Sequence, residues 1–176
     1  ELDLQALLFK PLFSQASLDK KIQKLKMLIL DVDGVLTDGG MYVSEKGDQM
    51  KRYHTHDGLA LLELGKSKKL TLGILSSGYT EHMVHDRATL LGIEHVYVGR
   101  EPKLDILNTW CTELGYSLDE VAIIGDDLND LPVMQAVGLA VCPASAVSKV
   151  KSVADIILSR KGGDACVREF IDNYLQ

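Results

Sequence analysis

The sequence is poor in cysteine and has no long apolar run. Its three cysteines, Cys111, Cys142 and Cys166, form no C-x-x-C pair, and each lies in an apolar stretch, where a free cysteine behaves as a small hydrophobic side chain. A reducing compartment is the simplest interpretation. No apolar run reaches the roughly 18 residues that a membrane span needs, and the N-terminal residues lack the basic-then-apolar order of a signal peptide. We therefore expect a cytoplasmic protein with no membrane partner.

An excess of positive charge is also lacking. Lys and Arg together number 19 against 25 Asp and Glu, which gives a formal net charge of -6 at pH 7. Nucleic-acid binding is normally driven by the neutralisation of phosphates with Lys and Arg, so we expect no nucleic-acid partner. A small anionic substrate stays compatible with this charge if cations are concentrated locally.

The length and the 46% hydrophobic content fit one domain with a sizeable core. We interpret residues 1–24 as a helical or linker leader and residues 25–176 as the folded domain. The chain begins with Glu1 rather than Met, so the sequence leaves open whether it is a processed chain or part of a longer one.

Short apolar runs alternate with helical stretches along the domain. Continuous apolar runs are typical of central strands in a parallel sheet, and their alternation with helices predicts a doubly wound, Rossmann-like α/β fold. The expected strands are 27–30, 70–75, 96–98, 121–124, 139–141 and, more weakly, 156–158, and the expected helices are 58–68, 81–91, 103–114 and 130–137.

Residues 39–53 break this alternation. Two short β-prone segments surround a glycine-containing turn there, which predicts a β-hairpin insertion. The hairpin is too small to be a cap domain, and no other insertion is long enough to supply one. The active site should therefore be open unless another subunit covers it.

Carboxylates follow two of the expected strands. Asp31 and Asp33 come after the first strand, and the stretch GDDLND at 125–130 follows the strand 121–124. Open α/β sheets bind ligands at this carboxyl edge, where converging carboxylates repel one another unless a cation holds them. Such an oxygen-rich site suits Mg²⁺. Helix capping explains Asp127 or Asp130 but not the pairing with Asp31.

Candidate ligands for an anion such as phosphate also stand at strand and helix ends. Ser76 and Ser77 end the second strand, where a hydroxyl and backbone N–H groups can hold phosphate oxygens, although an ordinary helix N-cap explains them equally well. Lys103 opens a helix and offers a cation, although a surface position is usual for a lone lysine.

The order of these motifs resembles the haloacid dehalogenase-type phosphatases. It consists of DVDGVLTD at 31–38, a serine at a strand end, Lys103 and GDDLND at 125–130, and the resemblance covers about residues 25–176. The stretches LTDGGMYV, HDGLAL, GDDLNDLPVM and KGGDACVREF resemble more narrowly the capless subgroup that acts on phosphates of 2-keto-3-deoxy sugar acids.

This resemblance implies a two-step phosphatase reaction. Asp31 attacks phosphorus to form an aspartyl-phosphate, and Asp33 protonates the leaving alkoxide and then activates water. The remaining implied roles are Mg²⁺ binding by Asp31, Asp126 and the backbone carbonyl of Asp33, support of that site by Asp127 and Asp130, and phosphate binding by Ser76 or Ser77 and Lys103.

The chain departs from its relatives after the second strand, where they commonly carry Thr-Gly-Arg or Thr-Gly-Glu and this chain has SSGY at 76–79. Which serine binds phosphate is therefore left open. Asp57-Gly58 and LPVM at 131–134 resemble enzymes for the eight-carbon 3-deoxy-D-manno-octulosonate 8-phosphate. PASA at 143–146 and REF at 168–170 resemble enzymes for nine-carbon, sialic-acid-type 9-phosphates. We favour the eight-carbon substrate.

The resemblance also implies an oligomeric state and suggests other functions to compare with a phosphatase. We expect a homotetramer in which the 39–53 hairpins pack together, since a lone hairpin is marginal in water and its edges invite pairing.

Arg168 would bind the substrate carboxylate, and a surface arginine on an amphipathic final helix is the alternative. An inactive tetramerisation domain of a sialic-acid-activating enzyme is disfavoured because the aspartates are retained. A mutase or phosphotransferase is disfavoured because no cap excludes water.

Overall fold

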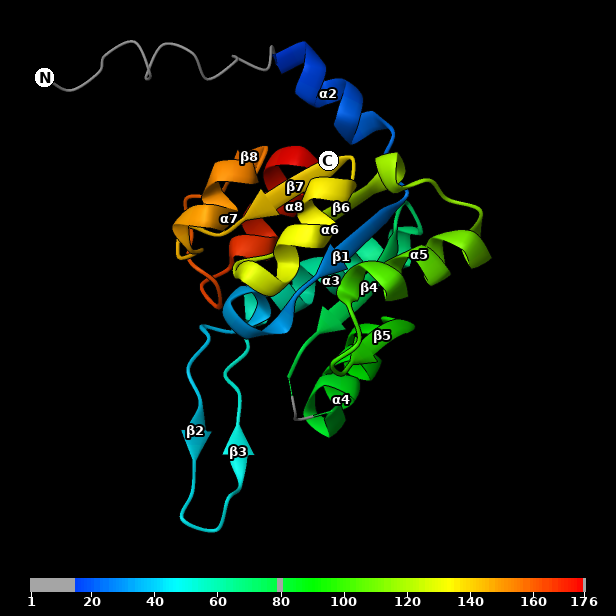
Figure 1. Cartoon of the computed structure of the whole chain (residues 1–176). Coiled ribbons are helices and arrows are strands. Elements are labelled where there is room, and N and C mark those ends of the chain that lie inside the picture. Colours follow the sequence, from blue (N-terminus) through cyan, green and yellow to red (C-terminus); the bar gives the residue numbers. More distant parts are fainter. Residues whose placement is uncertain (1–14, 79–80, 176) are drawn as a thin grey trace, which may run out of the picture.

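The computed structural model describes residues 15–78 and 81–175, and these form a six-stranded parallel sheet with helices on both faces (Figure 1). The strand order is β5-β4-β1-β6-β7-β8. The predicted doubly wound α/β fold is thus confirmed. The strands are β1 (Met27–Leu30), β4 (Thr71–Ser76), β5 (His95–Val98), β6 (Val121–Ile124), β7 (Leu139–Cys142) and β8 (Ile156–Ile157).

Strand β1 lies at the centre of the sheet. All four of its residues are buried, as are those of β6, because helices cover both faces. Leu30, the last residue of β1, is in register with Ile74 of β4 and Ile124 of β6. The segments that follow these three strands therefore leave the sheet at the same edge.

Two helical layers enclose two hydrophobic cores. One core includes Leu61, Ala88 and Phe170, and the other includes Leu107 and Val133. The helices of the first layer are α3 (Thr55–Ser67), α4 (Glu81–Leu91) and α8 (Cys166–Tyr174), and those of the second are α5 (Lys103–Leu114), α6 (Leu131–Ala136) and α7 (Ser148–Val153). Short helical turns are η1 (Val32–Leu36), η2 (Leu118–Glu120) and η3 (Leu128–Asp130).

The N-terminal leader is partly helical. Helix α2 (Gln15–Gln23) packs Leu18 and Ile22 against the first core, and Lys21 Nζ lies 2.7 Å from Asp155 Oδ1. The rest of the expected leader, residues 1–14, lies outside the described part of the chain. Among the described residues, no helix is both long and apolar enough to cross a membrane.

Several element boundaries differ from those expected. Helix α3 begins at Thr55 rather than at residue 58, because the His54 side chain caps it by accepting a hydrogen bond from the His56 N–H. Strand β4 ends on Ser76, one residue later than expected. The six-residue helix α7 was not predicted, since so few residues show no clear helical period.

The insertion forms the predicted hairpin, with β2 (Tyr42–Val43) paired antiparallel to β3 (Gln49–Met50). It projects away from the domain below the end of β1 (Figure 1). Its arms expose four large apolar side chains: Met41, Tyr42, Val43 and Met50. No cap domain is present in the described part of the chain, as predicted.

Candidate active site

The site lies at the point where the direction of strand addition in the sheet reverses. After β1 the chain builds outward through β4 and β5, then returns to place β6 on the other side of β1. Such a switch point opens a crevice at the carboxyl ends of the strands. A pocket of about 470 Å³ lies there, and Asp31, Asp33 and Asp126 are among the residues that line it.

Asp31 is held by its own backbone and by Lys103. It caps the turn η1, and its Oδ1 atom accepts a hydrogen bond from the Val32 N–H at 2.7 Å. Lys103 Nζ lies 2.9 Å from the same oxygen. Asp31 is only 4% exposed, yet it lines the pocket, so its carboxylate is fixed in orientation and accessible to a ligand.

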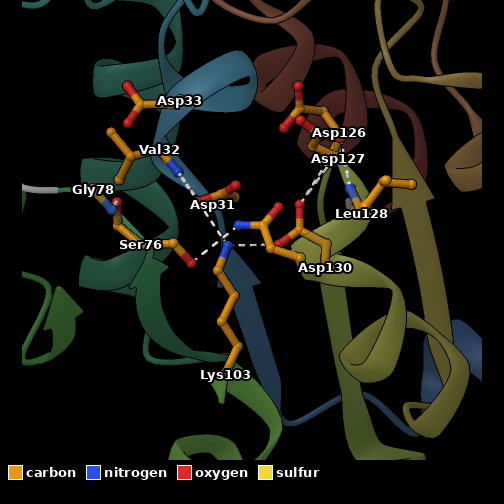
Figure 2. Close-up of polar contacts among 12 residues, drawn as sticks. Asp31, Val32, Asp33, Ser76, Gly78, Lys103, Asp126, Asp127, Leu128 and Asp130 are labelled. Carbon is orange, nitrogen blue, oxygen red and sulfur yellow. Dashed lines mark hydrogen bonds and ion pairs between the residues drawn. The ribbon is translucent and has the colours of Figure 1, made fainter. Parts of the chain in front are cut away.

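Lys103 also holds Asp130, which organises the loop after β6 (Figure 2). The ammonium of Lys103 lies 2.6 Å from Asp130 Oδ1. The other oxygen, Oδ2, accepts hydrogen bonds from the backbone N–H groups of Asp126 at 2.9 Å and Asp127 at 3.3 Å. Both oxygens of this fully buried carboxylate are therefore engaged.

Asp127 takes part in helix capping instead. Its Oδ1 atom accepts the Leu128 N–H at 2.7 Å at the start of η3. The capping alternative therefore describes contacts of both residues, because Asp130 Oδ2 accepts the Asp127 N–H in the same capping box. Capping does not explain the further contact of Asp130 with Lys103.

Carboxylate crowding perturbs the site. Burial, followed by repulsion from Asp130, raises the pKa of Asp31 to about 8. Burial and the charges of Asp130 and Asp127 raise the pKa of Asp126 to about 7. Burial alone would lower the pKa of Lys103, but Asp31 and Asp130 outweigh it and raise that pKa. The single positive charge of Lys103 thus offsets only part of the negative charge of the carboxylates around it.

The donor set fits a divalent cation. One oxygen each of Asp31, Asp126 and Asp130 lies within 4.8 Å of the others. Asp126 Oδ1 is buried without a hydrogen-bond partner, which is costly unless a ligand contacts it. A hard cation with oxygen ligands satisfies that atom and favours the ionised carboxylates. The Asp33 side chain is not part of this cluster.

Asp33 contacts a residue that the sequence did not single out. Its Oδ1 atom pairs with Nζ of Lys51, which follows β3 in the hairpin. The side chain of Lys51 is only 5% exposed, and it lines the same pocket. This contact could not be predicted from the sequence, because the pairing depends on where the hairpin lies relative to η1.

The two serines lie at different depths. Ser76 is buried, and its Oγ accepts a hydrogen bond from the Gly78 N–H at 3.3 Å. Ser77 lines the pocket, and its Oγ accepts a hydrogen bond from Asn129 Nδ2 at 3.1 Å. Residue 79 of the SSGY stretch lies outside the described part of the chain.

The C-terminal segment supports the loop that carries Asp31 and Asp33. The Val35 carbonyl accepts hydrogen bonds from the Gly163 N–H at 3.0 Å and from Cys166 Sγ at 3.4 Å. A Cβ atom on Gly162 would overlap the carbonyl oxygen of Gly34. Gly34 itself has a φ of +85°, and a Cβ atom there would overlap the Asp126 carboxylate. These close approaches explain the need for glycine at both positions.

Arg168 lies in a different pocket from Asp31. It lines a surface pocket with His56 and Arg160, and its Nε donates to Asp172 Oδ2 at 2.6 Å. Its backbone N–H donates to Asp57 Oδ1, which is buried and caps α8 from the neighbouring helix α3. Within one chain, the structure therefore does not bring Arg168 together with the other predicted site residues.

Comparisons with known proteins agree with this geometry. A family model described as haloacid dehalogenase-like hydrolase matches residues 95–170. The 3-deoxy-D-manno-octulosonate 8-phosphate phosphatase of Escherichia coli K12 is 36% identical over 152 residues, which is 86% of this chain and 80% of that protein. The chain belongs to the haloacid dehalogenase-like hydrolases. The prediction of a phosphatase of this family is therefore confirmed.

Solved structures of haloacid dehalogenase-like hydrolases share the whole architecture. A probable phosphatase of the yrbi family from Pseudomonas syringae is 41% identical with a TM-score of 0.87, covering 92% of this chain and 90% of its own. The 3-deoxy-D-manno-octulosonate 8-phosphate phosphatase of Moraxella catarrhalis is 32% identical with a TM-score of 0.87, covering 92% of each chain. That structure contains a magnesium ion, a phosphate ion and a KDO molecule.

Proposed function

We propose that this chain hydrolyses 3-deoxy-D-manno-octulosonate 8-phosphate to the free sugar acid and inorganic phosphate. The observation that carries the proposal is the Asp31, Asp126, Asp130 and Lys103 constellation at the sheet edge. Relatives named for this reaction align with most of the chain. An inactive assembly domain would have no need of a pocket lined by these carboxylates.

Asp31 is the nucleophile in this proposal. One of its carboxylate oxygens forms a bond to phosphorus as the bond from phosphorus to the sugar oxygen breaks, and Asp33 gives its proton to that leaving oxygen. Water then attacks the aspartyl-phosphate, Asp33 takes a proton from it, and Asp31 leaves as a carboxylate with inorganic phosphate as the product. Both side chains line the pocket where the substrate would bind.

Magnesium binding falls to Asp31 and Asp126, with the backbone carbonyl of Asp33 as the third protein ligand. When bound, Mg²⁺ offsets the charge of the phosphoryl oxygens and keeps the carboxylates ionised. Asp130 supports this site through its hydrogen bonds to the loop, and Asp127 supports it by capping η3.

Phosphate binding is assigned to Lys103 and to the segment after β4. The ammonium of Lys103 already lies beside the Asp31 carboxylate, so a phosphoryl group transferred to Asp31 would lie near this cation. Ser77 is the preferred phosphate ligand over Ser76 because it lines the pocket, whereas Ser76 Oγ is engaged with the Gly78 N–H below it.

A homotetramer completes the proposal. The exposed apolar side chains of Met41, Tyr42, Val43 and Met50 on the projecting hairpin support its packing against further copies. Within one chain, Arg168 does not line the pocket that contains Asp31. It can bind the substrate carboxylate only if assembly or substrate binding brings it to that pocket. Light scattering tests the assembly, and a fully active monomer would exclude the shared site.

Phosphate release distinguishes the candidate substrates. With Mg²⁺, we expect kcat/KM for the eight-carbon 8-phosphate to exceed that for N-acylneuraminate 9-phosphate by about tenfold or more. Asp31→Asn is the matched control for contaminating phosphatases. The opposite preference would assign the nine-carbon substrate. If neither substrate releases more phosphate than the Asp31→Asn control does, the result would favour an inactive assembly domain.

A further inference from the structure

We propose that Lys51 is a positioning residue for Asp33, through which the hairpin controls protonation of the leaving group. The inference rests on the proposed phosphatase reaction and adds to it a residue outside the four sequence motifs. It starts from the ion pair between Lys51 Nζ and Asp33 Oδ1, which joins the hairpin to the turn η1.

Burial of Lys51 makes this ion pair costly to break. The Lys51 side chain is 5% exposed, and a buried ammonium is costly unless it is paired. The Asp33 side chain is 39% exposed, and Asp33 lines the pocket. The lysine is therefore the rigid partner and the aspartate the accessible one, which is the arrangement expected where a scaffold group orients a reacting group.

Asp33 needs such a partner because little else fixes its carboxylate. The terminal torsion of aspartate is broad, so an isolated carboxylate rotates readily. Among the residues that the structure describes, Lys51 provides the one hydrogen bond found to this group. By occupying Oδ1, Lys51 leaves Oδ2 to carry the transferable proton.

The free oxygen faces the open part of the pocket. A Cβ atom on Gly78 would lie 3.3 Å from Asp33 Oδ2, so the absence of a side chain there leaves room beside this oxygen. Figure 2 shows Asp33 and Gly78 adjacent to each other at the edge of the site. A leaving alkoxide that enters between them meets Oδ2 rather than the oxygen held by Lys51.

The charges of the pocket wall make Lys51 distinctive. Among the described residues that line the pocket, Lys51 supplies the one cation, and Asp31, Asp33, Asp38 and Asp126 are among the acids. The next residue, Arg52, points to Asp38 instead, with its Nη1 atom 3.1 Å from Asp38 Oδ2. Arg52 thus anchors the same hairpin arm without touching Asp33, which makes it a matched control.

The experiment compares leaving groups in Lys51→Met, Lys51→Arg and Arg52→Met with Mg²⁺ present. The substrates are 3-deoxy-D-manno-octulosonate 8-phosphate, whose alkoxide must be protonated, and p-nitrophenyl phosphate, whose leaving group needs no proton. General acid catalysis contributes about 100-fold or more. Hydrolysis of the aspartyl-phosphate is common to both substrates, and kcat/KM reports only the steps up to formation of this intermediate. In Lys51→Met we therefore expect kcat/KM to fall about 30-fold on the alkyl phosphate and less than about threefold on the aryl phosphate.

The variants separate positioning from anchoring. Lys51→Arg, which keeps the cation, should restore most of the alkyl-phosphate rate, and Arg52→Met should change both substrates by the same factor. Melting temperatures identify any loss due to unfolding. Equal losses on both substrates in Lys51→Met would overturn the role of Lys51 alone, whereas a wild-type protein that releases no phosphate would overturn the proposed function as well.

Discussion

Replacing Asp130 by Asn tests whether this buried carboxylate maintains the site. Asp130 accepts a hydrogen bond from Lys103 at one oxygen and from two backbone N–H groups at the other. An asparagine offers one oxygen and one NH₂ group, so in either orientation a donor faces a donor. The substitution keeps the volume of the side chain and removes only its charge and one acceptor.

The expected cost follows from these contacts. Hydrogen bonds to charged groups contribute about 1.5–3 kcal/mol each. If the asparagine oxygen faces the two backbone N–H groups, the bond from Lys103 is lost and the other two bonds lose their charge, so the free energy of unfolding should fall by about 3 kcal/mol. For a protein of this size, that corresponds to a decrease in Tm of about 9 °C. Relief of the repulsion between Asp130 and Asp31 lowers the cost in the absence of Mg²⁺.

Urea unfolding with and without Mg²⁺ measures this effect. The loss should be larger with Mg²⁺, because displacement of the Asp126 loop weakens the binding that stabilises the wild-type protein. Asp127→Asn is the matched control, since the asparagine oxygen can still cap η3 and only the charge is removed, so it should cost less than about 1 kcal/mol. Equal unfolding midpoints for wild type and Asp130→Asn, or equal costs for the two variants, would refute the reasoning.

Three further outcomes are expected from the same geometry. Asp31→Asn should leave less than about 1% of the turnover while the fold is retained, because it removes the proposed nucleophile at nearly constant volume; circular dichroism and phosphate release check this. EDTA should abolish activity, and Ca²⁺ should restore little of it, because its longer and more variable coordination misplaces the reacting groups. Gly162→Ala should lower kcat and the free energy of unfolding together, by about 1–3 kcal/mol for the latter, since its Cβ atom overlaps the Gly34 carbonyl; full activity would show that the loop tolerates displacement.

The sheet and the position of the site could be predicted because they depend on local patterns. Buried parallel strands read as continuous apolar runs, and the polar residue that ends each run must lie at the carboxyl edge. Asp31 after β1 and Asp126 after β6 were found in this way.

Contacts between distant segments could not be predicted in the same way. The pairing of Lys51 with Asp33 depends on the direction in which the hairpin leaves the sheet, and no residue near either one encodes that direction. The depth of Ser76 relative to Ser77 follows from the one-residue shift of β4, which ends on Ser76 rather than on residue 75. The position of Arg168 follows from the capping of α8 by Asp57, a contact between helices far apart in the chain.

The support of the Val35 carbonyl by Gly163 and Cys166 has a consequence for the order of events during synthesis. The Cys166 contact joins residues that are 131 positions apart. Asp31 thus leaves the ribosome long before the segment that braces its loop, even though domains begin to fold from the N-terminal side. A nascent chain should therefore contain Asp31, the proposed nucleophile, before its loop is supported. Emergence of α8, and not the synthesis of the predicted catalytic motifs, is therefore the step after which the Asp31 loop can be braced.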